Sequence, residues 1–196
     1  GVIQLMRKLR DGRDPVPVAG TEGGVSPFFS PDGAWIGFIT VDGKLRKVPT
    51  AGGGAITLAS PTNPVYAAAA WLDDGTIIYV DDSTGVRRVP ADGGAGSVVM
   101  ASGATQRRST PALSPLPGSR GFLYTACPGN CGVESAVYVY DFAADSGRLL
   151  VDNAAQPMQA APCAVLRSLA SSGHESKLIM CFTHFDEVKG DNLRDL

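Results

Sequence analysis

The chain has 196 residues, of which 44% are hydrophobic and 18% charged, a composition typical of a globular protein and not of a disordered one. Its formal net charge of -2 gives no reason to expect nucleic acid as a partner. No stretch approaches the roughly 20 apolar residues of a membrane-spanning helix, so we expect no membrane insertion within this chain. The 24 glycines and 14 prolines are spread along the sequence, which indicates many turns and short strands, as in all-β proteins.

The first segment, residues 2–20, predicts two strands of an incomplete unit. Its sequence VIQLMRKLRDGRDPVPVAG has the same layout as KLRKVPTAGGGAITL further along, a basic strand followed by a turn and a second strand. We expect Arg7, Lys8 and Arg10 to form a solvated surface, because short runs of charge usually do. The segment begins without methionine or a signal-peptide pattern, so we interpret the chain as a fragment of a larger protein.

An internal repeat follows. FFSPDGAWIGFITVDGKLRKVPTAGG at residues 28–53 returns as AWLDDGTIIYVDDSTGVRRVPADGG at 70–94, and a looser copy occupies 112–147. The glycine of the first turn recurs after 42 and then 43 residues, at Gly33, Gly75 and Gly118. A period of this length indicates one supersecondary unit per repeat.

Each copy opens with a turn sequence. Proline presets φ, an aspartate side chain accepts hydrogen bonds from the backbone ahead of it, and glycine tolerates positive φ. We therefore assign a structural role to the turn residues Ser30, Pro31, Asp32, Gly33, Asp73, Asp74, Gly75 and Gly118. Carboxylates such as Asp32, Asp74 and the pair Asp81 and Asp82 could instead serve acid–base chemistry or bind Ca²⁺, but the turn interpretation is favoured.

Three more strands follow each turn. Their β-rich runs are 35–39, 45–48 and 56–58, then 76–80, 86–89 and 97–100, then 121–125, 137–140 and 148–151. With the strand that leads into the turn, each period has four short antiparallel strands, which is the signature of a β-propeller blade. The aromatic residues that alternate along them should form the core: Phe29, Trp35, Phe38, Trp71 and Tyr79.

The fold expected is therefore an all-β propeller with a repeat of about 42 residues. We place it at residues 1–160, as a partial first blade followed by blades near 27–60, 69–102 and 111–153. Only three full blades are legible, so we expect a partial propeller whose open sheet edges permit self-association.

The phrases GTEGG at 20–24, SPDG at 30–33 and VPADGG at 89–94 resemble the WD40-like repeat (PD40, TolB-like) of bacterial propeller proteins. The chain is most similar to the propeller region attached to bacterial serine/threonine protein kinases. The resemblance implies a non-catalytic module that binds a protein or peptide or acts as a sensor, without cofactor or metal. It favours an extracytoplasmic location, periplasmic or in the cell envelope. The alternative is an accessory propeller of an enzyme, either a kinase or a prolyl-oligopeptidase-like serine peptidase, whose catalytic domain lies outside this chain.

The tail, residues 161–196, departs from the repeat. It predicts a short helix near 164–170 and an apolar strand near 177–183, in a stretch that is atypical and could be non-homologous or partly disordered.

Cys127 and Cys131 flank a Pro-Gly-Asn turn, so a loop disulfide, two free thiols and a metal or redox site all stay open. No nucleophile-elbow or kinase motif is present, and the two histidines, His174 and His184, lie in the tail. We therefore expect no catalytic residues in this chain.

Overall fold

The computed structural model describes residues 3–8, 14–61, 68–101, 112–126 and 136–151, and the description below concerns these ranges. The strands β1 (Gln4–Arg7) and β2 (Val16–Glu22) form a two-stranded antiparallel sheet. The second sheet contains β3 (Gly24–Phe29), β4 (Trp35–Thr40), β5 (Leu45–Pro49) and β6 (Ile56–Ala59). The third contains β7 (Ala69–Trp71), β8 (Thr76–Asp81), β9 (Gly85–Pro90) and β10 (Ser97–Ala101). The fourth contains β11 (Leu113–Pro115), β12 (Gly121–Ala126), β13 (Ala136–Asp141) and β14 (Ser146–Val151).

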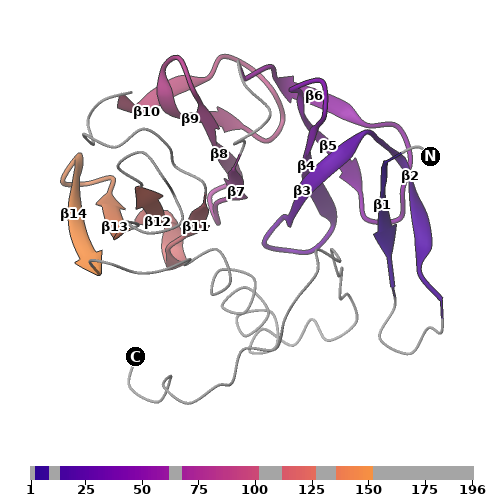
Figure 1. Ribbon diagram of the computed structural model, residues 1–196, viewed down its shortest axis with the longest axis horizontal. Coiled ribbons are helices and arrows are strands. Elements are labelled where there is room, and N and C mark those ends of the chain that lie inside the picture. The colour runs from indigo at the N-terminus through magenta and orange to yellow at the C-terminus, as the bar shows by residue number, and fades with distance from the viewer. Residues whose placement is uncertain (1–2, 9–13, 62–67, 102–111, 127–135, 152–196) are drawn as a thin grey trace.

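The three four-stranded antiparallel sheets confirm the expected four-stranded blades. β1 and β2 pair with each other in the segment where two strands were expected. Strand order in every sheet follows chain order, so each repeat folds as a meander. Figure 1 shows the sheets following one another in an arc, with the first strands β3, β7 and β11 on its inner side and the last strands β6, β10 and β14 on its outer side. Among the described residues, no helix has the length and apolar character to cross a bilayer.

Face-to-face packing of neighbouring sheets explains the apolar middle strands. β4 and β8 each have five consecutive buried residues, because both faces of these strands are covered by an adjoining sheet. Phe38 is fully buried, and Trp71 and Tyr79 are 7% and 5% exposed, while Phe29 and Trp35 are partly buried against the core. The predicted aromatic positions therefore lie in or against the core.

Three apolar clusters join successive sheets. Leu5 and Val18 of the first sheet pack with Ile36 and Phe38 of the second. Between the second and third sheets the cluster is Ile39, Leu45, Leu58, Trp71, Ile77, Tyr79, Val89 and Ala91. Between the third and fourth it is Ala70, Leu72, Ile78, Val80, Val86, Met100, Leu113, Phe122, Tyr124, Ala126 and Tyr140. Each large side chain fully buried here contributes ~1.5–3 kcal/mol.

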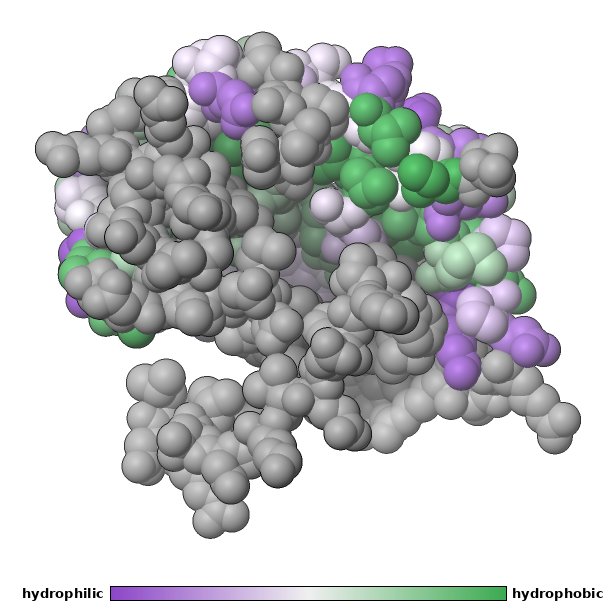
Figure 2. Space-filling view, in the orientation of Figure 1, coloured by the Kyte–Doolittle hydropathy of each residue, from purple (hydrophilic) through white to green (hydrophobic). Residues whose placement is uncertain are grey.

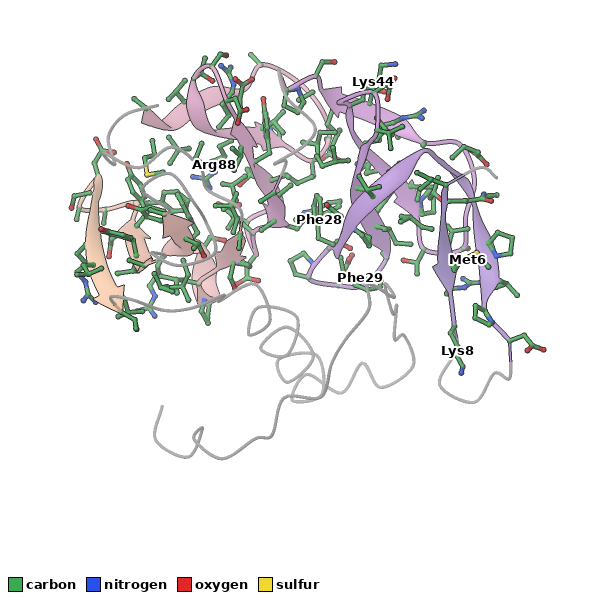
Figure 3. The ribbon with its side chains drawn as sticks, in the orientation of Figure 1. Met6, Lys8, Phe28, Phe29, Lys44 and Arg88 are labelled. Carbon is green, nitrogen blue, oxygen red and sulfur yellow. The ribbon has the colours of Figure 1, made fainter. Side chains whose placement is uncertain are left out.

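One glycine on a middle strand is required by packing. A Cβ at Gly37 would lie 2.2 Å from Cζ of Phe28, whose ring covers this position from the neighbouring strand. The Phe28 ring in turn contacts Trp71 edge-on, with ring centroids 6.3 Å apart. Figure 3 shows Phe28 directed from β3 toward β7, so this glycine permits a contact between two sheets.

Apolar side chains are also exposed at the outer side of the arc. Figure 2 shows hydrophobic residues over β5 and β6 in the upper right of the view. Ile56, at the start of β6, is 47% exposed. Every residue of β14 is exposed, including Leu149, Leu150 and Val151 at 48%, 48% and 49%. The last strand of the fourth sheet therefore has apolar side chains on both of its faces in contact with solvent.

Candidate functional site

One end of the sheets carries the turns that the repeat predicts. In an antiparallel meander, the turn after the first strand and the turn after the third strand lie at the same end of the sheet. We call this end the turn face. Its described turns in the four-stranded sheets are 30–34, 50–55, 72–75, 91–96, 116–120 and 142–145.

The first predicted turn of the second sheet is held by its own side chains. The Ser30 amide donates to the Trp35 carbonyl at 3.0 Å, and the Ser30 hydroxyl donates to Oδ1 of Asp32 at 2.5 Å. The same Asp32 oxygen accepts from the Ala34 amide at 3.0 Å. Gly33 has φ +67°, and Pro31 lies within the turn. These hydrogen bonds fix the backbone of the turn.

The corresponding turn of the third sheet repeats this chemistry. Oδ1 of Asp74 accepts from the Thr76 amide at 3.1 Å and from its hydroxyl at 2.6 Å. The Gly75 amide donates to the Leu72 carbonyl at 3.2 Å, and Gly75 has φ +78°.

The turns of the third and fourth sheets are joined to each other. Oδ2 of Asp73 accepts from the Gly118 amide at 2.7 Å. The Asp74 amide donates to the hydroxyl oxygen of Ser119 at 2.9 Å. Gly118 has φ +69° and Ser119 φ +53°, so the fourth turn is shaped to present these two groups. Asp73 therefore fixes one sheet relative to the next, a role that the repeat alone does not indicate.

A cation recurs at one position of the sheets. Arg7, Lys47 and Arg88 share the same register, because they pair with the first residue of the following strand, Val16, Ile56 and Ser97. We call these three residues the cation row. Lys47 and Arg88 also pair with the third residue of the preceding strand, Gly37 and Ile78, and in the fourth sheet the residue paired in this way, with Leu123, is Val139.

The first member of the cation row corrects an expectation. Arg7 was expected on a solvated surface with Lys8 and Arg10, but its Nη1 donates to the Thr50 carbonyl of the second sheet at 2.8 Å. The residue is partly buried between the two sheets. Lys8 is also partly buried, and Arg10 lies outside the described residues.

Arg88 makes the most contacts of the three. Its Nε donates to the Thr76 hydroxyl at 2.7 Å, and its Nη2 forms an ion pair with Asp74 of the same sheet. The guanidinium lies 4.9 Å from the centre of the Phe142 ring in the fourth sheet. Figure 3 shows Arg88 between the third and fourth sheets, so it acts as a clamp across this junction.

Lys47 has a different environment. Its ammonium lies 4.3 Å from the centre of the Trp35 ring in its own sheet. Across the junction it lies 3.4 Å from Oδ1 of Asp92 in the third sheet. The Lys47 side chain is 7% exposed, whereas that of Asp92 is fully exposed.

A tyrosine adds to the junction of the third and fourth sheets. The Tyr140 hydroxyl lies 2.9 Å from the Val99 carbonyl oxygen and 2.5 Å from Oδ1 of Asp145. Burial of Tyr140, together with the Asp145 carboxylate, raises its pKa to about 12. Burial likewise raises the pKa of Tyr124. Neither phenol is suited to proton transfer near neutral pH.

Aspartates at the opposite end of the sheets also have structural partners. Hydrogen bonds from Lys44 and then Thr40 hold the pKa of Asp42 below its usual value. Oδ1 of Asp81 accepts from the amides of Ser83 and Thr84 at 3.0 and 3.2 Å. These carboxylates stabilise turns between the second and third strands.

The structure describes no group of three or more His, Cys, Asp or Glu residues arranged to hold a metal ion. Cys127, Cys131, His174 and His184 lie outside the described residues, so the loop disulfide stays a prediction. The predicted elements of the tail, 161–196, also lie outside them.

Solved structures share this architecture. TolB from Acinetobacter baumannii superposes with a TM-score of 0.56 at 13% identity, over 71% of this chain and 35% of that one. The chain has the fold of a TolB-like β-propeller. Oligogalacturonate lyase from Vibrio parahaemolyticus gives a TM-score of 0.51 at 12% identity, over 79% and 49%. Hydrazine synthase from Kuenenia stuttgartiensis gives 0.50 at 11%, over 72% and 41%.

No family model matches the sequence, and no curated protein matches it. This propeller chain spans between a third and a half of the length of the solved structures above. Identities of 11–13% show the shared propeller fold alone, since one fold serves many functions.

Proposed function

We propose that the chain is a non-catalytic module that binds a protein or peptide at its turn face. Two contacts between the third and fourth sheets support this. Asp73 accepts a hydrogen bond from the Gly118 amide, and the Arg88 guanidinium lies over the Phe142 ring. Loops that are held in place before binding lose less conformational entropy when a partner docks, which favours affinity.

The absence of catalysis belongs to the same proposal. Asp32, Asp74 and Asp81 each accept hydrogen bonds from backbone amides of their own turns, which occupies the carboxylates that acid–base chemistry would need. A kinase or peptidase domain elsewhere in a larger protein stays a prediction, which the flanking coding sequence tests. An extracytoplasmic location is proposed from the TolB-like fold, and fractionation of cells expressing the full-length gene tests it.

Peptide selection on the immobilised chain tests where binding occurs. A peptide selected from a displayed random library is labelled, and its affinity is measured by fluorescence polarisation. We expect Arg120→Glu, on the turn face, to weaken binding by about tenfold or more, because exposed charges steer and fix a docked partner. Lys44→Glu makes the same charge change at the opposite end and should leave the affinity unchanged.

Binding that depends on Lys44 and not on Arg120 would overturn the proposed surface. Turnover of ATP or of a peptide substrate by the purified chain would overturn the proposal of a non-catalytic module.

Self-association through an open edge is a further part of the proposal. It is supported by the exposure of Leu149 and Leu150 on the last strand of the fourth sheet. Sedimentation velocity over a range of concentrations tests it, and Leu149→Lys should shift the chain toward the monomer.

A further inference from the structure

Lys47 is a buried cation whose hydrogen-bonding capacity is mostly unused. An ammonium group has three donors, and within the described part of the chain the acceptor of Lys47 is Asp92, at 3.4 Å. Charge-assisted hydrogen bonds are ordinarily about 2.7–2.9 Å long. The Trp35 ring covers the ammonium at 4.3 Å but accepts no conventional hydrogen bond.

The other members of the cation row have shorter contacts. Arg7 donates from Nη1 to the Thr50 carbonyl at 2.8 Å, although its buried Nε has no acceptor among the described residues. Arg88 forms an ion pair with Asp74 of its own sheet. Asp74 lies two residues before Thr76, the residue that pairs with Pro90. In the second sheet the residue two before Trp35 is Gly33. The aspartate of that turn, Asp32, accepts from the Ser30 hydroxyl and the Ala34 amide, and the ion pair of Lys47 is with Asp92 of the third sheet instead.

The first junction is closed beside the turn that follows β5. The Gly53 amide donates to the Ala19 carbonyl at 3.1 Å, and a Cβ at Gly20 would lie 2.0 Å from the Gly53 carbonyl oxygen. A Cβ at Gly52 would lie 3.2 Å from the Ala19 nitrogen. Met6 pairs with Pro17 and Gln4 with Glu22, so β2 has extra residues, 18–21, opposite Leu5. This bulge brings Ala19 and Gly20 into contact with the turn after β5.

The second junction is open at the equivalent turn. A Cβ at Gly93 would meet no described atom within 4 Å, and one at Gly94 would meet only Pro90, at 4.0 Å. Asp92, beside these glycines, is fully exposed and still reaches the Lys47 ammonium. A carboxylate can therefore approach Lys47 from solvent along the path that Asp92 already follows.

We propose that Lys47 binds a carboxylate of the protein or peptide ligand, and that the Asp92 side chain occupies this position when the ligand is absent. The proposal rests on the function proposed above and adds the chemistry of the ligand. The carboxylate could be a peptide C-terminus or an Asp or Glu side chain. On binding, it displaces Asp92 and takes up the ammonium donors beside Trp35.

Three short peptides test the ligand class against the full chain by calorimetry. The first is acetyl-trialanine with a free C-terminal carboxylate, the second is acetyl-Ala-Asp-Ala amide, and the third is acetyl-trialanine amide. We expect at least one of the two acids to bind about tenfold or more tightly than the neutral amide, since charge-assisted hydrogen bonds are roughly twice as strong as neutral ones. The acidic peptide that binds more tightly shows whether the carboxylate is a peptide C-terminus or an acidic side chain.

Variants test the residue. Lys47→Met should abolish the preference for the acid, and Asp92→Asn should raise the affinity for the acid about threefold or more, because the internal competitor loses its charge. Lys44→Met, an exposed lysine at the opposite end, is the matched control and should change neither. Asp92→Asn alters an exposed side chain, so it tests the proposal even if Lys47→Met fails to fold.

Equal affinity for acids and amide, or weaker binding of the acid by Asp92→Asn, would overturn the proposal. The function proposed above would survive that result if the selected peptide still binds in an Arg120-dependent manner. It would fail, independently of Lys47, if no turn-face substitution affects the selected peptide.

Discussion

The junction between the second and third sheets differs from the junction between the third and fourth in how each uses the same position of the repeat. At the latter, Arg88 pairs with Asp74 and covers the Phe142 ring, and the turns are joined through Asp73. At the former, Lys47 has one long contact with an exposed carboxylate and lies over the Trp35 ring of its own sheet. A repeat therefore fixes the position of a cation, while its neighbours decide how closely that cation is paired across the junction.

The largest effect is expected in the aromatic cluster of the clamped junction. Phe122 is fully buried and its ring lies 5.1 Å from Tyr140 and 5.8 Å from Tyr124 and Phe142, centre to centre. Phe122→Ala should lower the free energy of unfolding by ~3–5 kcal/mol, because it removes apolar burial and leaves a cavity. Urea denaturation followed by circular dichroism measures this loss. A loss below that of an exposed substitution such as Val41→Ala would contradict the packing described.

Arg88 and Lys47 should contribute differently to the free energy of unfolding. Arg88→Met should cost ~1–3 kcal/mol, because Asp74 and Thr76 lose a charged partner and the ring contact is lost. Lys47→Met should cost less than ~1 kcal/mol, because replacing a poorly paired buried charge by an apolar side chain is often neutral. Both values come from the same denaturation experiment. Equal costs would remove the distinction between the two junctions.

The hydrogen bond between Asp73 and the Gly118 amide should contribute less to the free energy of unfolding. Asp73→Ala should lower stability by ~0.5–1.5 kcal/mol, because the Gly118 amide loses its acceptor across the junction. Asp73→Asn keeps an acceptor oxygen and serves as the control, with a smaller loss. Equal losses in the two variants would show that a neutral acceptor oxygen at residue 73 contributes nothing to this junction.

The smallest effect is a titration. Tyr140 has a folded-state pKa of about 12, above the usual value of 10.0, so its contribution to stability is complete below pH 10 and is lost as the pH rises through 12. Absorbance at alkaline pH should show two of the five tyrosines, Tyr140 and Tyr124, ionising late in the native chain. Tyr140→Phe should lower the amplitude of this late step, and an unchanged amplitude would contradict the raised pKa of Tyr140.

The strands and turns could be predicted because they depend on local chemistry. Gly33, Gly75 and Gly118 mark the turns by spacing alone, and all three have the expected positive φ. The role of Asp32 and Asp74 in these turns could be predicted in the same way, since each accepts a hydrogen bond from the amide two residues ahead.

The contacts between sheets could not be predicted in this way. Asp73 and Gly118 are 45 residues apart, and their pairing depends on how one sheet is placed on the next. Arg7 was expected in solvent because a short basic run contains no information about a carbonyl 43 residues away. The signal that could have found the cation row was the alignment of Arg7 with Lys47 and Arg88 at equal register.

The chain order of strands within each sheet has a consequence for synthesis. Because β3 to β6 pair only with their neighbours in sequence, the second sheet has all its strands once residue 59 has left the ribosome. Contacts of this kind are local and close quickly, whereas the packing of one sheet on the next waits for the following repeat. Nascent chains halted when Ala59, Ala101 and Val151 have each emerged from the ribosome should therefore gain protease resistance in discrete steps, one for each completed sheet.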